Sequence, residues 1–120
     1  MLVFSSDSGF HYAGDGKLGG IVKPNDGICH LDEKGNYNMS IYQDYPSLSQ
    51  INVEVKKHKI NVIFAVTSDQ LPIYKRLSDQ LEGSTAGKLE NDSSNVVELV
   101  KDQYSVSTYS CCCWFRIYRT

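Results

Sequence analysis

The stretch Ile60-Asn-Val-Ile-Phe-Ala-Val-Thr67 is an apolar run that is interrupted only by Asn61 and is rich in β-branched residues. A run of this kind is typical of a parallel strand that is buried on both faces of its sheet. We expect two more strands, a short, apolar and buried one over residues 2–6 and a weaker one over residues 84–89. The central stretch decides the fold class, because a strand buried on both faces needs helices on both sides of its sheet.

Helices are predicted over residues 48–58, 71–81 and 94–104, so that strands and helices alternate along the chain. In the second helix, apolar residues recur at helical spacing, Pro72 lies near the first turn, and Gly83 ends the helix. This alternation implies a partial doubly wound parallel sheet with right-handed crossovers and flanking helices, which is a Rossmann-like arrangement. We therefore expect an α/β fold.

Length and charge exclude several classes of protein. The chain has 120 residues, room for about one small domain, and its 12 basic and 14 acidic residues give a formal net charge of −2. The basic residues form no stripe that could follow a phosphate backbone, which argues against a nucleic-acid partner. No apolar run approaches the ~20 residues that span a bilayer, and the N-terminus has no basic segment followed by an apolar core. We therefore expect no signal peptide or transmembrane helix in this chain.

Residues 9–47 form a long predicted loop region that contains seven of the nine glycines and two of the three prolines. A connection of this length inside a compact domain is usually functional. The three histidines of the chain lie at no spacing that pairs them with a nucleophile or with another metal ligand. We expect them to be exposed or structural.

Asp7 follows the first predicted strand, which ends in Ser-Ser-Asp. The carboxyl ends of strands are where an open α/β sheet binds its ligands, and hard oxygen atoms are the ligands that divalent cations prefer. An aspartate at a strand end is equally often a helix or turn cap. The residues alone therefore leave Asp7 as either a cation ligand or a cap.

Gly14-Asp-Gly-Lys-Leu-Gly19 has the G-x-G-x-x-G spacing of a dinucleotide-binding loop, with Asp32 and Glu33 near the position of a ribose-binding acid. That fingerprint needs its glycines in the tight turn between a strand and a helix. Here about seven residues intervene after the strand, and Pro24 cuts off any helix. A small nucleotide-binding α/β enzyme is therefore a rival hypothesis that this spacing disfavours. Residues 83–89 imitate a P-loop but are better explained as the start of a glycine-containing strand.

A resemblance to a known family is carried by seven motifs: Leu2-Val-Phe-Ser-Ser-Asp7, Asp15-Gly-Lys-Leu-Gly-Gly-Ile-Val22, Pro24-Asn-Asp-Gly27, Cys29-His30, Asp44-Tyr-Pro-Ser47, Ile63-Phe-Ala-Val-Thr67 and Asp92-Ser-Ser-Asn-Val96. They occur in this order in the integrin beta subunit and lie in the second half of its I-like domain. The resemblance covers about residues 2–104 and implies a von Willebrand factor A-like fold. It also implies a non-enzymatic, divalent-cation-dependent cell adhesion receptor.

The resemblance implies roles for three residues. Asp7 matches the aspartate at the edge of the metal-ion-dependent adhesion site, which also takes part in the adjacent regulatory calcium site. Asn91 matches the loop before the last helix, where a backbone carbonyl reaches the regulatory metal. Lys17 matches the basic residue on a short helical turn that inserts into the β-propeller of the alpha subunit. The implied cofactors are Mg²⁺ or Mn²⁺ together with Ca²⁺, and the main site is incomplete in this chain because its other ligands precede the matched part.

An extracellular setting is implied as well. Cys29 matches a cysteine that pairs with one upstream of this chain, so that here it is either unpaired or paired with the cysteines at 111–113. Asn38-Met-Ser40 and Asn91-Asp-Ser93 are N-glycosylation sequons, and Asn91, beside a metal loop, is the weaker of the two. We expect the parent to be a single-pass cell membrane protein that pairs with an integrin alpha subunit and binds extracellular matrix or a cell-surface protein. It would meet the membrane only through segments absent from this chain.

Two parts are expected from these patterns. Residues 1–104 are interpreted as a partial integrin beta I-like domain, and residues 105–120 as a tail that does not match the family. The tail has three consecutive cysteines, no helical period and no turn chemistry. We interpret it as derived from an intron or a frameshift, or else as a divergent edge strand. A non-functional truncated product is a further alternative.

Overall fold

The computed structural model describes the backbone of residues 1–115 and the side chains of residues 1–105. The chain forms two compact units, which are described one at a time. Unit 1 comprises Met1–Gly9 and Val55–Thr120, and unit 2 comprises Phe10–Glu54. Residues 116–120, the end of the expected tail, lie outside the described residues.

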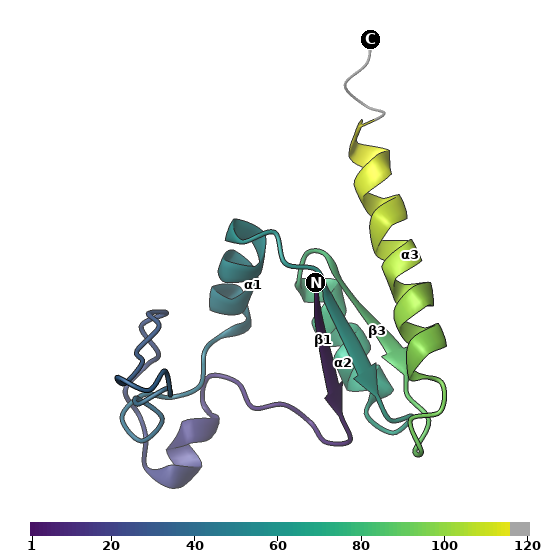
Figure 1. Cartoon of the computed structure of the whole chain (residues 1–120). Coiled ribbons are helices and arrows are strands. Elements are labelled where there is room, and N and C mark those ends of the chain that lie inside the picture. The colour runs from purple at the N-terminus through teal and green to yellow at the C-terminus, as the bar shows by residue number, and fades with distance from the viewer. Residues whose placement is uncertain (116–120) are drawn as a thin grey trace. The chain divides into compact units, whose positions relative to one another are not determined.

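Strands and helices alternate as predicted. The elements in chain order are β1 (Leu2–Ser6), the 3₁₀ helix η1 (Asp15–Gly19), α1 (Leu48–Lys57), β2 (Val62–Val66), α2 (Leu71–Gln80), β3 (Ser84–Lys88) and α3 (Val96–Phe115). The three strands form one parallel sheet in the order β1-β2-β3 (Figure 1). Every residue of the central strand β2 is buried. The α/β fold and the parallel sheet are therefore confirmed.

Helices α2 and α3 cover opposite faces of this sheet. On one face Tyr74 of α2 packs against Phe64, with ring centroids 5.4 Å apart. On the other face Leu99 of α3 forms a cluster with Ile63 and Ala65. Because successive residues of a strand point to opposite faces, Phe64 and its two neighbours meet different helices. This is the doubly wound arrangement that the sequence predicts.

The close approach of α3 to the sheet depends on Gly87. A Cβ built at Gly87 would lie 3.1 Å from Cγ of Leu99 and 3.3 Å from Nε2 of Gln103, which is tighter than ordinary van der Waals contact. Gly87 pairs with Ala65 of β2, so two small residues lie side by side under this helix. Small residues at these positions allow α3 to lie close to the strands.

Two predictions about unit 1 are wrong. Strand β1 is not buried, since Leu2, Val3 and Phe4 are 52%, 40% and 42% exposed. Within the described residues β1 pairs with a strand on one side only. The last helix does not end at Tyr104 but continues to Phe115, because no glycine or proline interrupts it. The alternative of a divergent edge strand is wrong over residues 105–115, which belong to α3, while the origin of residues 105–120 and the domain boundary before them stay predictions.

Unit 2 is rich in loops, as expected for residues 9–47. It contains η1, the first turns of α1 and an isolated antiparallel bridge between Leu31 and Tyr37. Helix α1 crosses from this unit into unit 1, which begins again at Val55. Of the helices in the described part of the chain, none is long and apolar enough to cross a membrane.

Tyr74→Ala is expected to lower the free energy of unfolding by about 3–5 kcal/mol. Tyr74 is 1% exposed and its ring contacts those of Phe4 and Phe64. Tyr74→Phe keeps the ring and removes only the hydroxyl that donates to the Ser8 carbonyl at 2.9 Å, so its expected cost is about 1 kcal/mol. Urea denaturation followed by circular dichroism measures both variants. Equal losses of unfolding free energy in Y74A and Y74F would show that the hydroxyl, and not packing of the ring, accounts for the contribution of Tyr74.

Candidate functional site

Asp7 and Asn91 lie at the same edge of the sheet. Asp7 directly follows β1, and Asn91 lies in the turn after β3. Because the three strands run parallel, both residues are at the carboxyl edge. Strand β2 lies between β1 and β3 (Figure 1). This is the edge at which open α/β sheets bind their ligands.

The backbone around Asp7 is held by its neighbours. The Ser8 N–H donates to Oγ of Ser6 at 3.1 Å, and the Ser6 hydroxyl donates to the Ser8 carbonyl at 3.0 Å. That carbonyl also accepts the hydroxyl of Tyr74 at 2.9 Å. The carboxylate of Asp7 is exposed and accepts the Ser8 hydroxyl at 3.4 Å. Asp7 therefore presents a carboxylate to solvent from a fixed turn.

The loop that carries Asn91 is closed by Asn95. Nδ2 of Asn95 donates to the Lys88 carbonyl at 2.9 Å, and its Oδ1 accepts the Glu90 N–H at 2.8 Å. The Ser93 N–H donates to the Glu90 carbonyl at 2.8 Å, and Ser93 has a left-handed φ of 58°. The backbone of Asn91 is thus held in a tight turn beyond the end of β3.

The residues at this edge fit a divalent cation in ligand type but not in number. Mg²⁺ and Ca²⁺ take about six to eight oxygen ligands. At this edge Asp7 has an exposed carboxylate and Asn91 a backbone carbonyl, which are the two oxygens that the sequence predicts as ligands. Across the part of the chain that the structure describes, no group of three or more His, Cys, Asp or Glu side chains could hold a metal ion. The described residues are therefore too few to hold a cation alone.

Lys17 lies on the exposed turn η1 of unit 2, and the carboxylate of Asp44 lies on the inner side of that turn. Oδ2 of Asp44 accepts the Gly14 N–H at 2.6 Å, and Oδ1 accepts the Gly16 N–H at 2.8 Å. These bonds, with that from Gly14 the strongest influence, hold the pKa of Asp44 below its ordinary value. No role for Asp44 follows from its local sequence. The carboxylate and the turn are far apart along the chain, so no local pattern reveals their pairing.

A second carboxylate network of unit 2 is centred on Asp26. Its oxygens accept the Ile28 N–H at 3.0 Å and the side-chain amide of Gln43 at 2.8 Å, and lie 2.9 Å from Nε2 of His30. The Ile28 N–H first, then the Gln43 amide and His30, lower the pKa of Asp26 far below its ordinary value of 3.8. His30 is therefore a structural histidine, one of the two outcomes expected from the sequence.

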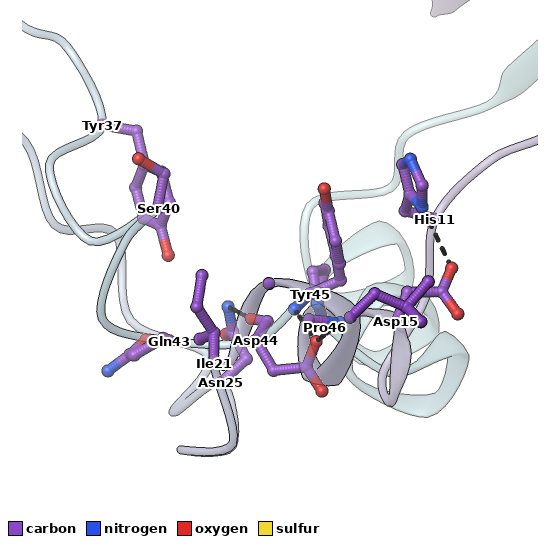
Figure 2. A pocket seen from close by; sticks show the side chains of 13 residues that line it. His11, Asp15, Ile21, Asn25, Tyr37, Ser40, Gln43, Asp44, Tyr45 and Pro46 are labelled. Atoms are coloured by element: carbon purple, nitrogen blue, oxygen red, sulfur yellow. Dashed lines mark hydrogen bonds and ion pairs between the residues drawn. The ribbon is translucent and has the colours of Figure 1, made fainter.

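Unit 2 also contains a cavity of about 680 Å³ with a largely apolar lining (Figure 2). Its wall includes the rings of Tyr37 and Tyr45. His11 stacks on Tyr45 with ring centroids 4.7 Å apart, and its Nδ1 lies 3.0 Å from a carboxylate oxygen of Asp15. Gln43 also lines the cavity, and its buried Oε1 has no hydrogen-bond partner among the described residues. The cavity therefore offers a mainly apolar surface.

The remaining predicted residues lie on the surface of unit 2 or lose their proposed role. Cys29 is exposed and free among the side chains that are described, and Asn38 is exposed in a loop. The segment from Gly14 to Gly19 is a turn with the short 3₁₀ helix η1, and it does not join a strand to an α-helix. The rival nucleotide-binding hypothesis therefore lacks the geometry that its motif requires.

Comparison with known proteins gives a consistent result over most of the chain. A family model described as the integrin beta chain VWA domain matches residues 1–110, which include the first part of the expected tail. The chain is 64% identical over 104 residues to integrin beta-PS of Drosophila melanogaster, 50% over 106 residues to integrin beta pat-3 of Caenorhabditis elegans, and 52% over 105 residues to integrin beta-7 of Homo sapiens. These matches cover 87–88% of this chain but only 12–13% of the length of the relatives.

Asp26→Asn is expected to remove the acid sensitivity of the turn at Ile28. The folded-state pKa of Asp26 is lowered, so its stabilising contribution is complete above the ordinary pKa of 3.8 and is lost as the pH falls below it. An NMR titration into the acid range should therefore shift the Ile28 amide in the parent chain but not in D26N. Asp79→Asn, which changes an exposed carboxyl on α2, is the control. An acid shift that persists in D26N would assign the titration to another group.

Proposed function

Because this chain belongs to the integrin beta chain VWA domain family, we propose that it forms part of the I-like domain of a divalent-cation-dependent cell adhesion receptor. Its relatives are integrin beta chains, which are adhesion receptors and not enzymes. One observation carries the proposal: Asp7 presents an exposed carboxylate on a fixed turn at the carboxyl edge of the parallel sheet.

In this function Asp7 contributes an oxygen ligand to the main Mg²⁺ or Mn²⁺ site and to the neighbouring Ca²⁺ site. The backbone carbonyl of Asn91 contributes to the Ca²⁺ site, and the missing ligands come from outside the described residues. When bound, the main cation supplies a coordination position for an acidic side chain of an extracellular matrix or cell-surface protein. The hydrogen bonds between Ser6 and Ser8 keep the Asp7 turn in shape for that task.

We assign Lys17 to the interface with an integrin alpha subunit. Lys17 is exposed on η1, and the adjacent Leu18 is 93% exposed. A protruding turn with one cationic and one apolar side chain suits insertion into a partner protein, because the apolar side chain gains burial and the cation gains a specific contact. The proposed receptor is therefore a heterodimer.

The proposed setting is the extracellular portion of a cell membrane protein. Cys29 would form a disulfide with a cysteine outside this chain, and Asn38 would carry N-linked glycan, whereas the weaker sequon at Asn91 would stay unmodified. The exposure of Cys29 and Asn38 supports these assignments. An exposed thiol can reach a partner sulfur, and an exposed asparagine in a loop can reach the glycosylation machinery.

Asp7→Ala is expected to abolish Mg²⁺- or Mn²⁺-dependent adhesion, because the cation loses a carboxylate ligand. The test places residues 1–104 in the matching segment of Drosophila integrin beta-PS and expresses the chimera with an alpha subunit. Asp79→Ala, which removes an exposed carboxylate from α2, should leave adhesion unchanged. Surface staining of the heterodimer controls for folding. The proposal would be refuted if D7A cells adhered as well as cells with the parent chimera while displaying the same amount of heterodimer at the surface.

Asn38→Gln is expected to remove one glycan from the secreted or surface-displayed chimera, so that N38Q migrates faster than the parent on a gel. Treatment of both proteins with peptide N-glycosidase should abolish this difference. Asn91→Gln should cause no shift, because the loop of Asn91 is tied down by the Asn95 side chain. Gel electrophoresis before and after deglycosylation distinguishes the two sites. A shift with N91Q and none with N38Q would reverse the assignment.

A further inference from the structure

We infer that Asp44 is a positioning residue for docking of the Lys17 turn on the alpha subunit, an inference that rests on the interface role proposed for Lys17. Asp44 is only 8% exposed, so its carboxylate is not part of the docking surface itself. It faces the backbone of η1 from the inside. Its effect on docking therefore passes through the conformation of that turn.

The two carboxylate oxygens of Asp44 accept three backbone N–H groups. Oδ2 accepts Gly14 at 2.6 Å, and Oδ1 accepts Gly16 and Tyr45, each at 2.8 Å. Hydrogen bonds to an ionised acceptor are about twice as strong as neutral ones. The Lys17 N–H in turn donates to the Gly14 carbonyl at 3.3 Å. If the Gly14 and Gly16 N–H groups lost their bonds to the carboxylate, the backbone at Lys17 would therefore lose its fixed position as well.

Apart from Asp15, whose carboxylate contacts His11 and accepts the Tyr12 N–H, the side chains of the turn offer little to hold it in place. Lys17 and Leu18 point to solvent, and the buried residue of η1 is Gly16, which has no side chain. Gly14 and Gly20, at the two ends, have left-handed φ values of 113° and 77°. Glycine adopts such backbone conformations without steric strain, but it also gives the unfolded chain more conformational freedom, which must be lost on folding. The N–H groups of Gly14 and Gly16 at the start of this turn are accepted by Asp44, which therefore helps to select one conformation.

Asp44 is itself anchored through its backbone. Its N–H donates to the Lys23 carbonyl at 2.8 Å, and its carbonyl accepts Nδ2 of Asn25 at 3.2 Å. The space between Asp44 and Gly16 is already filled, because a Cβ at Gly16 would overlap Oδ1 of Asp44 and lie 3.0 Å from the Ile21 carbonyl oxygen. The carboxylate thus occupies a fixed position against the turn.

The first test measures amide hydrogen exchange of the full chain by NMR. Asp44→Ala should lower the protection of the Gly14 and Gly16 amides by roughly tenfold or more, because each loses a charged acceptor. The β2 amides should keep their protection, which shows that unit 1 remains folded. Unchanged protection at Gly14 and Gly16 would overturn the inference at its first step.

The second test is a double-mutant cycle in the integrin beta-PS chimera, read as the amount of heterodimer assembled with the alpha subunit. Asp44→Ala and Lys17→Ala should each lower assembly, and D44A should cause no further loss in the K17A background. A residue that merely supports folding would lower assembly in both backgrounds. An equal additional loss in the K17A background would therefore overturn the positioning role.

Two alanine substitutions at glycines of η1 test the contact between Asp44 and Gly16 from the side of the turn. Gly16→Ala places a methyl group against the Asp44 carboxylate and should lower assembly as D44A does. Gly19→Ala, in the same turn, meets no atom within 4 Å and should assemble like the parent. If K17A assembles normally, the proposed interface role of Lys17 fails and takes the inference with it. If K17A loses assembly while D44A and G16A do not, only the inference fails.

Discussion

Burial of β2 on both faces is the constraint on which unit 1 depends. Its five apolar residues lie between two parallel neighbours and between helices α2 and α3. Burial of apolar surface is the dominant favourable contribution to folding, at roughly 25 cal/mol per Å². Since β1 and β3 both pair with this strand in the same direction, their carboxyl ends meet at one edge. That shared direction brings Asp7 and Asn91, distant in sequence, to the same side of the sheet.

Unit 2 is held by a different kind of interaction. Many of its large apolar side chains are exposed, so little of its stability can come from an apolar core. Its loops are closed by carboxylates that accept backbone N–H groups: Asp44 at η1, Asp26 at Ile28, and Asp32, which accepts the N–H groups of Lys34 and Asn36. Buried backbone groups need such partners, and ionised acceptors are strong ones. The unit therefore keeps a defined backbone while presenting apolar side chains, a combination suited to contact with a partner protein.

Features that depend on local sequence could be predicted, whereas features that depend on contacts between distant residues could not. The strands, α2 and the cation-ligand role considered for Asp7 follow from local patterns, namely an apolar run, helical spacing and an acid at a strand end. The exposure of β1 could not be predicted, because it depends on how many strands and helices lie beside it. The continuation of α3 to Phe115 was missed because an irregular apolar pattern weakens the helical signal without breaking the backbone hydrogen-bond ladder.

By itself the sequence determined the α/β class, the order of the elements and membership of the integrin beta family, because periodicity and the order of motifs are properties of the chain read locally. Only the tertiary structure decided that Asp44 accepts the N–H groups of the Lys17 turn and that Gly87 lies under α3. Each of these depends on residues that are distant along the chain coming within contact distance, and local sequence carries no measure of that distance.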